Sequence, residues 1–376
     1  MTEVRTALIV GAGIAGPACA LALARVGIES TVVEAHAGPT DGVGAILTLA
    51  FNGLDVLRSL GVEGSIVAIA QSIQAVEMSD GAGHIFARHA AGGDLLSRDD
   101  LARILGDQAK AAGIPVNYGL RLTGVTQLST GIVASFDDGS TVEADLLIGA
   151  DGIHSTVRTL IDPAAPGPVY EGVLGFGAAT EAPTVVAEAH VMNFAFGRTF
   201  LGYWRLPDSR IGWFASLPRI EQLSWREIRD VPNEQWLAEL REAYSGHQPG
   251  AELLAHTGPD ELITTGPTLR MPSIPHWFSD RMVLIGDAVH APSSSSGQGA
   301  SLALESALEL ARCLRDVPDR AGAFAAYEAL RRPRVEAVAA AAAAANQVKA
   351  GHKDDAAAAG FDATSYRIDF DARVTT

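Results

Sequence analysis

Three glycines near the N-terminus are spaced like those of a turn that binds the phosphates of a dinucleotide. Gly11, Gly13 and Gly16 follow an apolar run at residues 6–10 and precede an alanine-rich stretch with helical character, residues 17–26. Gly11 would permit the tight turn, Gly13 would let the backbone approach a pyrophosphate, and Gly16 would let helix and strand pack closely. The residue types therefore predict a phosphate-binding turn.

The helix start and a second strand complete a βαβ unit. N–H groups around Ile14 and Ala15 would bind the pyrophosphate, because the helix dipole favours negative charge there. A β-branched run at residues 30–33 ends at Glu34, 18 residues after Gly16, near the position of a ribose-binding acid. Glu34 would disfavour a phosphorylated ribose. The unit predicts an adenine dinucleotide and leaves both NAD and FAD open.

Two later segments repeat a design in which an acid follows a buried strand. Asp151 follows the apolar residues 146–150, and Asp287 follows residues 282–286. A serine-rich loop and a long helical pattern come after Asp287. Because open α/β sheets bind ligands at the carboxyl ends of their strands, both acids are expected at the binding edge.

A fourth segment has the sequence Ser97-Arg98-Asp-Asp-Leu. In order and spacing the four segments resemble those of single-component FAD-dependent monooxygenases, the family of para-hydroxybenzoate hydroxylase and of the tetracycline-modifying and polyketide-tailoring hydroxylases. The resemblance implies a tightly bound FAD whose ribityl chain is hydrogen-bonded by Asp287. It places Arg98 near the phosphate and ribityl region, although Arg98 could also be a surface residue at a helix start. Gly297, Gly299 and Ala300 would direct N–H groups at the flavin's pyrimidine edge and favour the anionic reduced flavin.

Other residues are assigned by the same resemblance. Leu122 corresponds to a position that touches adenine. Asp151 and Arg158 belong to a motif that contacts FAD and, transiently, NADH or NADPH; Arg158 could instead pair with a carboxylate. His154 and His290 are interpreted as structural histidines.

The chain departs from the family pattern at two places. Ser294 occupies the position of a usual proline, with Pro292 two residues earlier, and Glu305-Ser306 replaces a usual Glu-Asp pair. The first change lies beside the expected flavin ring and bears on oxygen activation. The second concerns helix capping or local polarity.

The expected fold class is α/β, with a Rossmann-like FAD-binding lobe built on a βαβ parallel sheet, a second lobe with a mixed or antiparallel sheet, and C-terminal helices at 323–330 and 333–349. A peripheral or interface tail would follow. The expected segments are 1–66, 96–165 and 272–350 for the FAD-binding domain, 67–95 and 166–271 for the substrate-binding domain, and 351–376 for the tail.

The segment between Arg158 and Arg281 contains all five tryptophans. Its short alternating runs are typical of hairpin strands. Aromatic side chains facing a flavin would suit a flat apolar substrate, and ordinary sheet core is the alternative for each ring. The tryptophans are Trp204, Trp213, Trp225, Trp236 and Trp277.

Composition excludes several classes of protein. The net charge of −16 opposes binding to nucleic acid or anionic lipid. Residues 1–5 show no leader pattern, so export is not expected, and the most apolar long stretch, residues 335–345, is shorter than the ~20 residues a membrane span needs. Cys19 and Cys313 lie far apart, which favours a reducing, cytoplasmic location. No His, Cys and carboxylate cluster has metal-ligand spacing, so no metal is expected. A monomer and a homodimer are both compatible.

The resemblance implies a reaction in which NADH or NADPH reduces the flavin, O2 adds to form a flavin hydroperoxide, and oxygen passes to an aromatic or polycyclic small molecule. Hydroxylation, epoxidation and ring-expanding insertion all remain open. The sequence nominates no catalytic side chain. The alternatives are an FAD-dependent dehydrogenase or reductase, a flavin-holding partner or sensor without turnover, and a flavin-dependent halogenase. A flavin-dependent halogenase needs an active-site lysine, and no lysine precedes Lys110 in this chain. The halogenase is therefore disfavoured.

Overall fold

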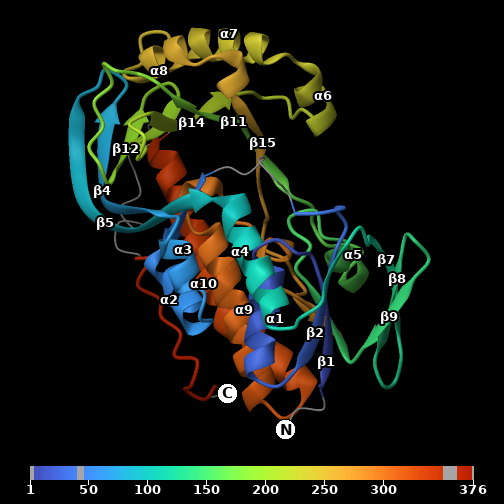
Figure 1. Cartoon of the computed structure of the whole chain (residues 1–376). Helices are drawn as coiled ribbons and strands as arrows, with labels where there is room; N and C mark the ends of the chain where they lie inside the picture. The colour runs from blue at the N-terminus through green and yellow to red at the C-terminus, as the bar shows by residue number, and fades with distance from the viewer. Residues whose placement is uncertain (1–3, 40–45, 350–361, 375–376) are drawn as a thin grey trace.

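The computed structural model describes residues 4–39, 46–349 and 362–374. Its first sheet has the order β16-β17-β10-β1-β2-β6, and neighbouring strands are parallel except at the edge strand β16. The central strands are apolar because both faces of the sheet are covered, by helices on one side and by α5 (Thr156–Ile161) with a small antiparallel sheet on the other (Figure 1). The strands are β1 (Thr6–Val10), β2 (Glu29–Glu34), β6 (Val116–Tyr118), β10 (Leu146–Gly149), β16 (Phe278–Ser279) and β17 (Met282–Leu284).

The second sheet has eight strands in the order β15-β11-β14-β13-β12-β4-β5-β3. It is mixed, because β12 and β4 are parallel while the other neighbours are antiparallel. The strands are β3 (Ile46–Ala50), β4 (Gln71–Asp80), β5 (Ile85–Ser97), β11 (Val169–Thr180), β12 (Val191–Phe196), β13 (Phe200–Arg205), β14 (Ile211–Pro218) and β15 (Ile263–Arg270).

A third, antiparallel sheet joins β7 (Leu122–Gln127), β8 (Ile132–Phe136) and β9 (Thr141–Ala144). Helices α1, α4, α9 and α10 pack side by side beside the first sheet, while α7 and α8 lie at the opposite end, over the second sheet (Figure 1). The helices are α1 (Ala15–Arg25), α2 (Phe51–Ser59), α3 (Glu63–Val67), α4 (Arg98–Ala111), α5 (Thr156–Ile161), α6 (Trp225–Asp230), α7 (Asn233–Ala243), α8 (Gly250–His256), α9 (Gly299–Asp316) and α10 (Arg320–Lys349), with single 3-10 turns η1 (Pro259–Glu261), η2 (Gly286–Ala288) and η3 (Ser294–Ser296).

The expected α/β fold with two sheet-based lobes is confirmed. The division into domains stays a proposal. Within it, β3 belongs to the segment expected in the first lobe, yet it pairs with β5 and extends the second sheet. No helix of the described residues is long and apolar enough to cross a membrane.

Two helices were expected near the C-terminus, and the structure has one. α10 runs from Arg320 to Lys349 with Pro333 in its interior. Proline removes one helical hydrogen bond and usually ends or kinks a helix. Here the side chains on either side of it, Arg331 and Arg334, are both held by Glu305 of α9, so packing overrides the local signal.

The end of the chain packs on the first lobe. Of the expected tail, residues 351–361 and 375–376 lie outside the described residues, whereas 362–374 are placed. Ile368 and Phe370 are buried, and the Phe370 ring lies between the guanidinium groups of Arg25 and Arg315. The described part is therefore core-forming and not peripheral.

The two faces of the eight-stranded sheet differ. Trp213 points to the face covered by helices, where it shares a core with Trp236 of α7. The opposite face carries Phe194, Phe200 and Phe214, whose ring centroids are 5.6 to 6.4 Å apart.

Of the two alternatives left open for each tryptophan, a place in the ordinary core is the one found for most of them. Trp204 alone of the five packs with the phenylalanine cluster, 6.3 Å from Phe214. Trp213 and Trp236 are on the helix-covered face, Trp277 is in the core of the first lobe, and Trp225 is partly exposed on α6. Sequence spacing cannot assign a strand residue to a face until its pairing is known.

Candidate functional site

The glycine-rich turn follows β1 and leads into α1. Gly11 has a φ of +110°, and a Cβ there would lie 2.3 Å from the Ala150 carbonyl oxygen. A Cβ on Gly16 would lie 1.9 Å from the Gly11 carbonyl oxygen, whereas one on Gly13 would meet nothing within 4 Å. Gly11 and Gly16 are thus required by the protein's own packing. The open space at Gly13 is what close approach of a ligand to the backbone needs.

Glu34 ends β2 next to this turn. Its Oε2 accepts a hydrogen bond from the Ala12 N–H at 2.8 Å, and its Oε1 accepts one from the His36 N–H at 3.0 Å. The carboxylate fixes the turn and retains acceptor capacity for a second donor.

The glycine-rich turn after β1 and the Asp287 segment after β17 lie in contact. A Cβ on Gly286 would lie 2.9 Å from the Cβ of Ala15, which with Ile14 begins α1. Asp287 follows in η2, and an Arg98 Nη2 lies 3.7 Å from its Oδ2. Burial raises the pKa of Asp287, and the charge of Arg98 opposes that rise.

Arg98 is the first residue of α4. Ser97 caps this helix, because its Oγ accepts a hydrogen bond from the Asp100 N–H at 3.0 Å. The Arg98 side chain is 60% exposed, so it can reach a bound anion without breaking internal packing. The cap thus places a cation beside Asp287.

The segment that begins at Asp151, after β10, uses its side chains for hydrogen bonds within the protein. Asp151 accepts hydrogen bonds from the Ser155 Oγ at 2.5 Å and from the N–H groups of Thr156 and Val157, which begin α5. Burial raises the pKa of Asp151, and these hydrogen bonds act against the rise. Its oxygens are largely engaged, which weakens its prediction as a cofactor contact.

Arg158 is buried; burial lowers the pKa of its guanidinium, and the charge of Asp151 acts against that shift. Arg158 donates to the carbonyl oxygens of Ala288 at 2.9 Å and Ile153 at 2.8 Å, which ties the Asp151 segment to the Asp287 segment. His290 is structural as expected: its Nε2 lies 2.7 Å from the Ser306 Oγ. His154 is exposed.

Leu122 is the first residue of β7 in the small third sheet, and it is 5% exposed within the core of the first lobe. Two residues earlier, the Leu120 N–H donates to the Glu34 carbonyl oxygen at 2.8 Å. Contact of Leu122 with adenine stays a prediction.

The start of α9 presents free backbone donors. Gly297 adopts a left-handed conformation with φ +60°, and Gly299 and Ala300 are the first residues of the helix. A Cβ on either glycine would meet nothing within 4 Å. The first N–H groups of a helix have no partner within it, so this end can bind a polar ring edge.

The serine-rich loop precedes this helix. Ser294, in the position of the usual proline, is exposed, while the neighbouring Ser293 Oγ donates to Glu171 Oε2 at 2.9 Å. The loop is thereby tied to β11 of the second sheet.

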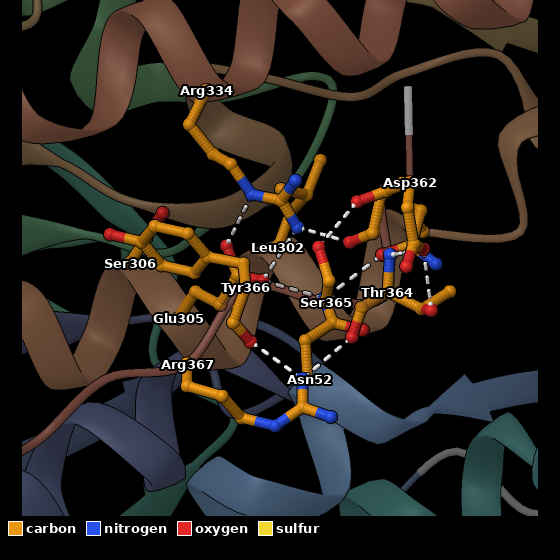
Figure 2. A network of polar contacts seen from close by, with 12 residues as sticks. Asn52, Leu302, Glu305, Ser306, Arg334, Asp362, Thr364, Ser365, Tyr366 and Arg367 are labelled. Atoms are coloured by element: carbon orange, nitrogen blue, oxygen red, sulfur yellow. Dashed lines mark hydrogen bonds and ion pairs between the residues drawn. The ribbon is translucent and has the colours of Figure 1, made fainter. Parts of the chain in front are cut away.

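One buried polar cluster was missed at the sequence level. Asn52, Gln298, Glu305 and Arg331 are each at most 4% exposed and are joined by hydrogen bonds and an ion pair; Figure 2 shows part of the cluster. In the sequence, Glu305 stands out only as part of the Glu305-Ser306 departure from the usual Glu-Asp pair. Asn52 carries no motif signal, because its partners are more than 240 residues away.

The arrangement fits FAD. Two helix N-termini, of α1 and α9, border the group formed by Gly13, Arg98 and Asp287, and the spaces beside Gly13, Gly297 and Gly299 are open. No group of three or more His, Cys, Asp or Glu side chains in the described part of the chain could hold a metal ion.

Comparisons with known proteins agree with this geometry. Residues 3–342 match the model of the FAD binding domain family. The chain is 29% identical to 6-hydroxynicotinate 3-monooxygenase of Pseudomonas fluorescens over 88% of each chain, and 30% identical to kynurenine 3-monooxygenase of Stenotrophomonas maltophilia over 89% of this chain and 77% of that one. The crystal structure of Klebsiella pneumoniae HpxO with FAD and uric acid superposes with a TM-score of 0.81 at 24% identity, covering 94% of this chain and 90% of that one.

The chain therefore belongs to the FAD binding domain family. It is an enzyme, an FAD-dependent monooxygenase, and FAD is its cofactor, as the motifs predicted. Which individual residues contact the FAD stays a prediction.

Proposed function

We propose that the enzyme uses NADH or NADPH and O2 to hydroxylate or epoxidise an aromatic or polycyclic small molecule by way of a flavin hydroperoxide. The bound FAD would supply the redox chemistry and the activation of oxygen. The protein would bind the cofactor, orient the substrate and exclude water.

The observation that carries this proposal is the aromatic face of the second sheet. Phe194, Phe200, Phe214 and Trp204 cover the side away from α7 and α8, and Figure 1 shows the first lobe on that side. Ring faces and edges recognise flat apolar molecules. Relatives named for 6-hydroxynicotinate and for urate, both flat rings, support the same substrate class.

The chain's residues would act in recognisable roles. Gly13 and the start of α1 would bind the pyrophosphate, Glu34 the ribose, and Arg98 with Asp287 the ribityl region. The N–H groups of Gly299 and Ala300 would stabilise negative charge at the pyrimidine edge. The proposal assigns no side chain as an acid or a base, so substrate orientation would be the protein's main contribution.

The test is oxygen consumption by the purified holoenzyme with NADH or NADPH and a panel of phenolic, heteroaromatic and polycyclic compounds under ¹⁸O2. A product that carries one ¹⁸O atom, with consumption of O2 and reductant in equal amounts, is expected for at least one compound. Oxidised products without ¹⁸O throughout the panel would instead indicate the dehydrogenase or reductase. A variant with Phe214→Ala, compared with Phe176→Leu on the other face, should raise the KM for the substrate with little change in FAD content.

A further inference from the structure

The turn that begins α9 is held in part by the side chain of Gln298, and the backbone N–H of the same residue donates to the Ser296 Oγ at 3.1 Å. Gln298 lies between two glycines, Gly297 and Gly299, and glycine constrains the backbone less than any other residue. The Gln298 side chain is 4% exposed, so it points inward and not into solvent. Whatever fixes this side chain therefore fixes the backbone donors next to it.

The partner of Gln298 comes from a distant segment. Asn52, the second residue of α2, donates from its Nδ2 to Gln298 Oε1 at 2.9 Å and to Glu305 Oε1 at 2.6 Å. A single amide thus bridges the residue before α9 and a residue inside that helix.

Glu305 is a firm anchor for this bridge. Its Oε2 lies 2.7 Å from Arg331 Nη1, and its Oε1 lies 3.1 Å from Arg334 Nη2. Burial alone would raise the pKa of Glu305, but the two arginines and Asn52 lower it, so the group is a carboxylate. An ionised acceptor makes shorter and stronger hydrogen bonds than a neutral one.

The C-terminal segment closes the cluster from outside. The Tyr366 ring lies over the guanidinium groups of Arg331 and Arg334, with centroid distances of 5.6 and 4.8 Å. Arg334 also donates to the Ala363 carbonyl oxygen, and Figure 2 shows Arg334, Tyr366 and Glu305 together. The cluster is therefore shielded from water, which strengthens its electrostatic interactions.

A purely stabilising role explains Asn52 poorly. Its Oδ1 and the nearby Ser301 Oγ are buried without a hydrogen-bond partner in the described residues. An unsatisfied buried polar atom is costly, so an amide whose oxygen has no partner is not the side chain that stability alone would favour. The amide is better explained by what its donors hold in place.

We propose that Asn52 is a positioning residue for the flavin: by fixing Gln298 against Glu305 it aims the first N–H groups of α9 at the pyrimidine edge. The inference rests on the proposed site for FAD. Fixed donors stabilise the negative charge that the ring gains on reduction, and donors that must reorient do so less well. Asn52 therefore makes the reduction potential of the bound flavin more positive.

Asn233 provides a matched control. It is the first residue of α7 in the second lobe, and its Nδ2 also bridges two acceptors, the carbonyl oxygens of Pro259 at 2.8 Å and Leu262 at 3.1 Å. Asn52→Leu and Asn233→Leu each delete a bridging amide near a helix start. Only the first touches the turn before α9.

The experiment measures the midpoint potential of bound FAD by equilibrium reduction with a reference dye, together with FAD affinity and thermal unfolding of the apoprotein. Asn52→Leu should make the potential more negative and weaken binding of reduced FAD relative to oxidised FAD by about tenfold, the effect of one charge-assisted hydrogen bond. Asn233→Leu should match wild type in potential. Gln298→Met should reproduce the shift, and the double variant Asn52→Leu with Gln298→Met should add little to it, because the two residues act through each other.

The outcomes distinguish failure of the proposed FAD site from failure of the proposed role of Asn52. A wild-type chain that takes up no FAD would overturn the proposed site and the role of Asn52 with it. If wild type binds FAD but Asn52→Leu keeps the wild-type potential, or if the shifts of Asn52→Leu and Gln298→Met are additive, the positioning role alone is overturned. Should Asn52→Leu not fold, Gln298→Met carries the same test, and a wild-type potential in that variant rejects the proposal.

Discussion

The two lobes reach their binding surfaces by different routes. In the first lobe, short motifs after β1, β10 and β17 meet through the backbone, as the contacts of Gly11 with Ala150 and of Gly286 with Ala15 show. In the second lobe, the aromatic face is assembled from β12, β13 and β14, each of which alternates between a helix-covered face and an open one. A cofactor common to a family can be bound by backbone geometry, whereas a substrate surface is made of side chains that can vary.

Substitution in the glycine-rich turn should give the largest effect and separate fold from ligand binding. In Gly16→Val the new Cβ would lie 1.9 Å from the Gly11 carbonyl oxygen, a backbone atom that cannot move alone. We expect no folded monomer, because strand β1 and helix α1 could not pack. Circular dichroism and gel filtration of the purified chain check this. A folded variant with normal FAD content would show that the turn is not close-packed.

Gly13, in the same turn, should respond to substitution in the opposite way. A Cβ at Gly13 meets no protein atom within 4 Å, so we expect the Gly13→Val apoprotein to unfold near the wild-type temperature. FAD affinity should fall about a hundredfold or more, roughly 3 kcal/mol, because the side chain fills the space of the pyrophosphate. Asp287→Ala should release FAD as well. Fluorescence titration with FAD measures both, and full retention of FAD in both variants contradicts the site.

In the second lobe the two sheet faces should respond differently to truncation. Trp236→Ala, on the helix-covered face, should reduce the free energy of unfolding by about 3–5 kcal/mol and leave the KM for the substrate unchanged once folded. Phe214→Ala, on the open face, should cost less stability and raise KM instead. Urea unfolding and steady-state kinetics compare them. Equal effects on KM would contradict the division of the sheet into a core face and a substrate face.

A smaller effect concerns acid stability of the first lobe. Burial, and then the charge of Arg331, lower the pKa of His290 to about 3. The unfolded chain binds a proton near pH 6.5 and the folded chain does not, so stability is lost as the pH falls from about 6.5 toward 3. His290→Asn should reduce this loss by up to about 1.4 kcal/mol per pH unit in that window. Urea unfolding at several pH values measures the slope, and an unchanged slope contradicts the neutral buried state.

The cofactor lobe could be predicted because its signals are local. The types and order of Gly11, Gly13, Gly16, Asp287 and the α9 glycines indicated a phosphate-binding turn and a second helix start, and the structure brings them together. The motif around Asp151 was found too, but its carboxylate caps α5 and Arg158 binds carbonyl oxygens. A motif reveals which residues lie near a site and not which of their atoms remain available.

The rest depends on contacts between residues far apart in the sequence. Which tryptophans face the first lobe depends on strand register, and Asn52 reaches Gln298 across 246 positions. The continuous α10 depends on Glu305 holding arginines on both sides of Pro333. Local propensity gives the opposite answer there, because tertiary packing outweighs it.

The most direct test of the account is reconstitution of the purified chain with FAD, followed by the visible spectrum and a count of bound flavin. The account predicts one FAD per chain in the wild type, with a flavin spectrum, and a folded but colourless Gly13→Val variant. A wild-type chain that stays colourless in excess FAD, while its circular dichroism shows it to be folded, would contradict it.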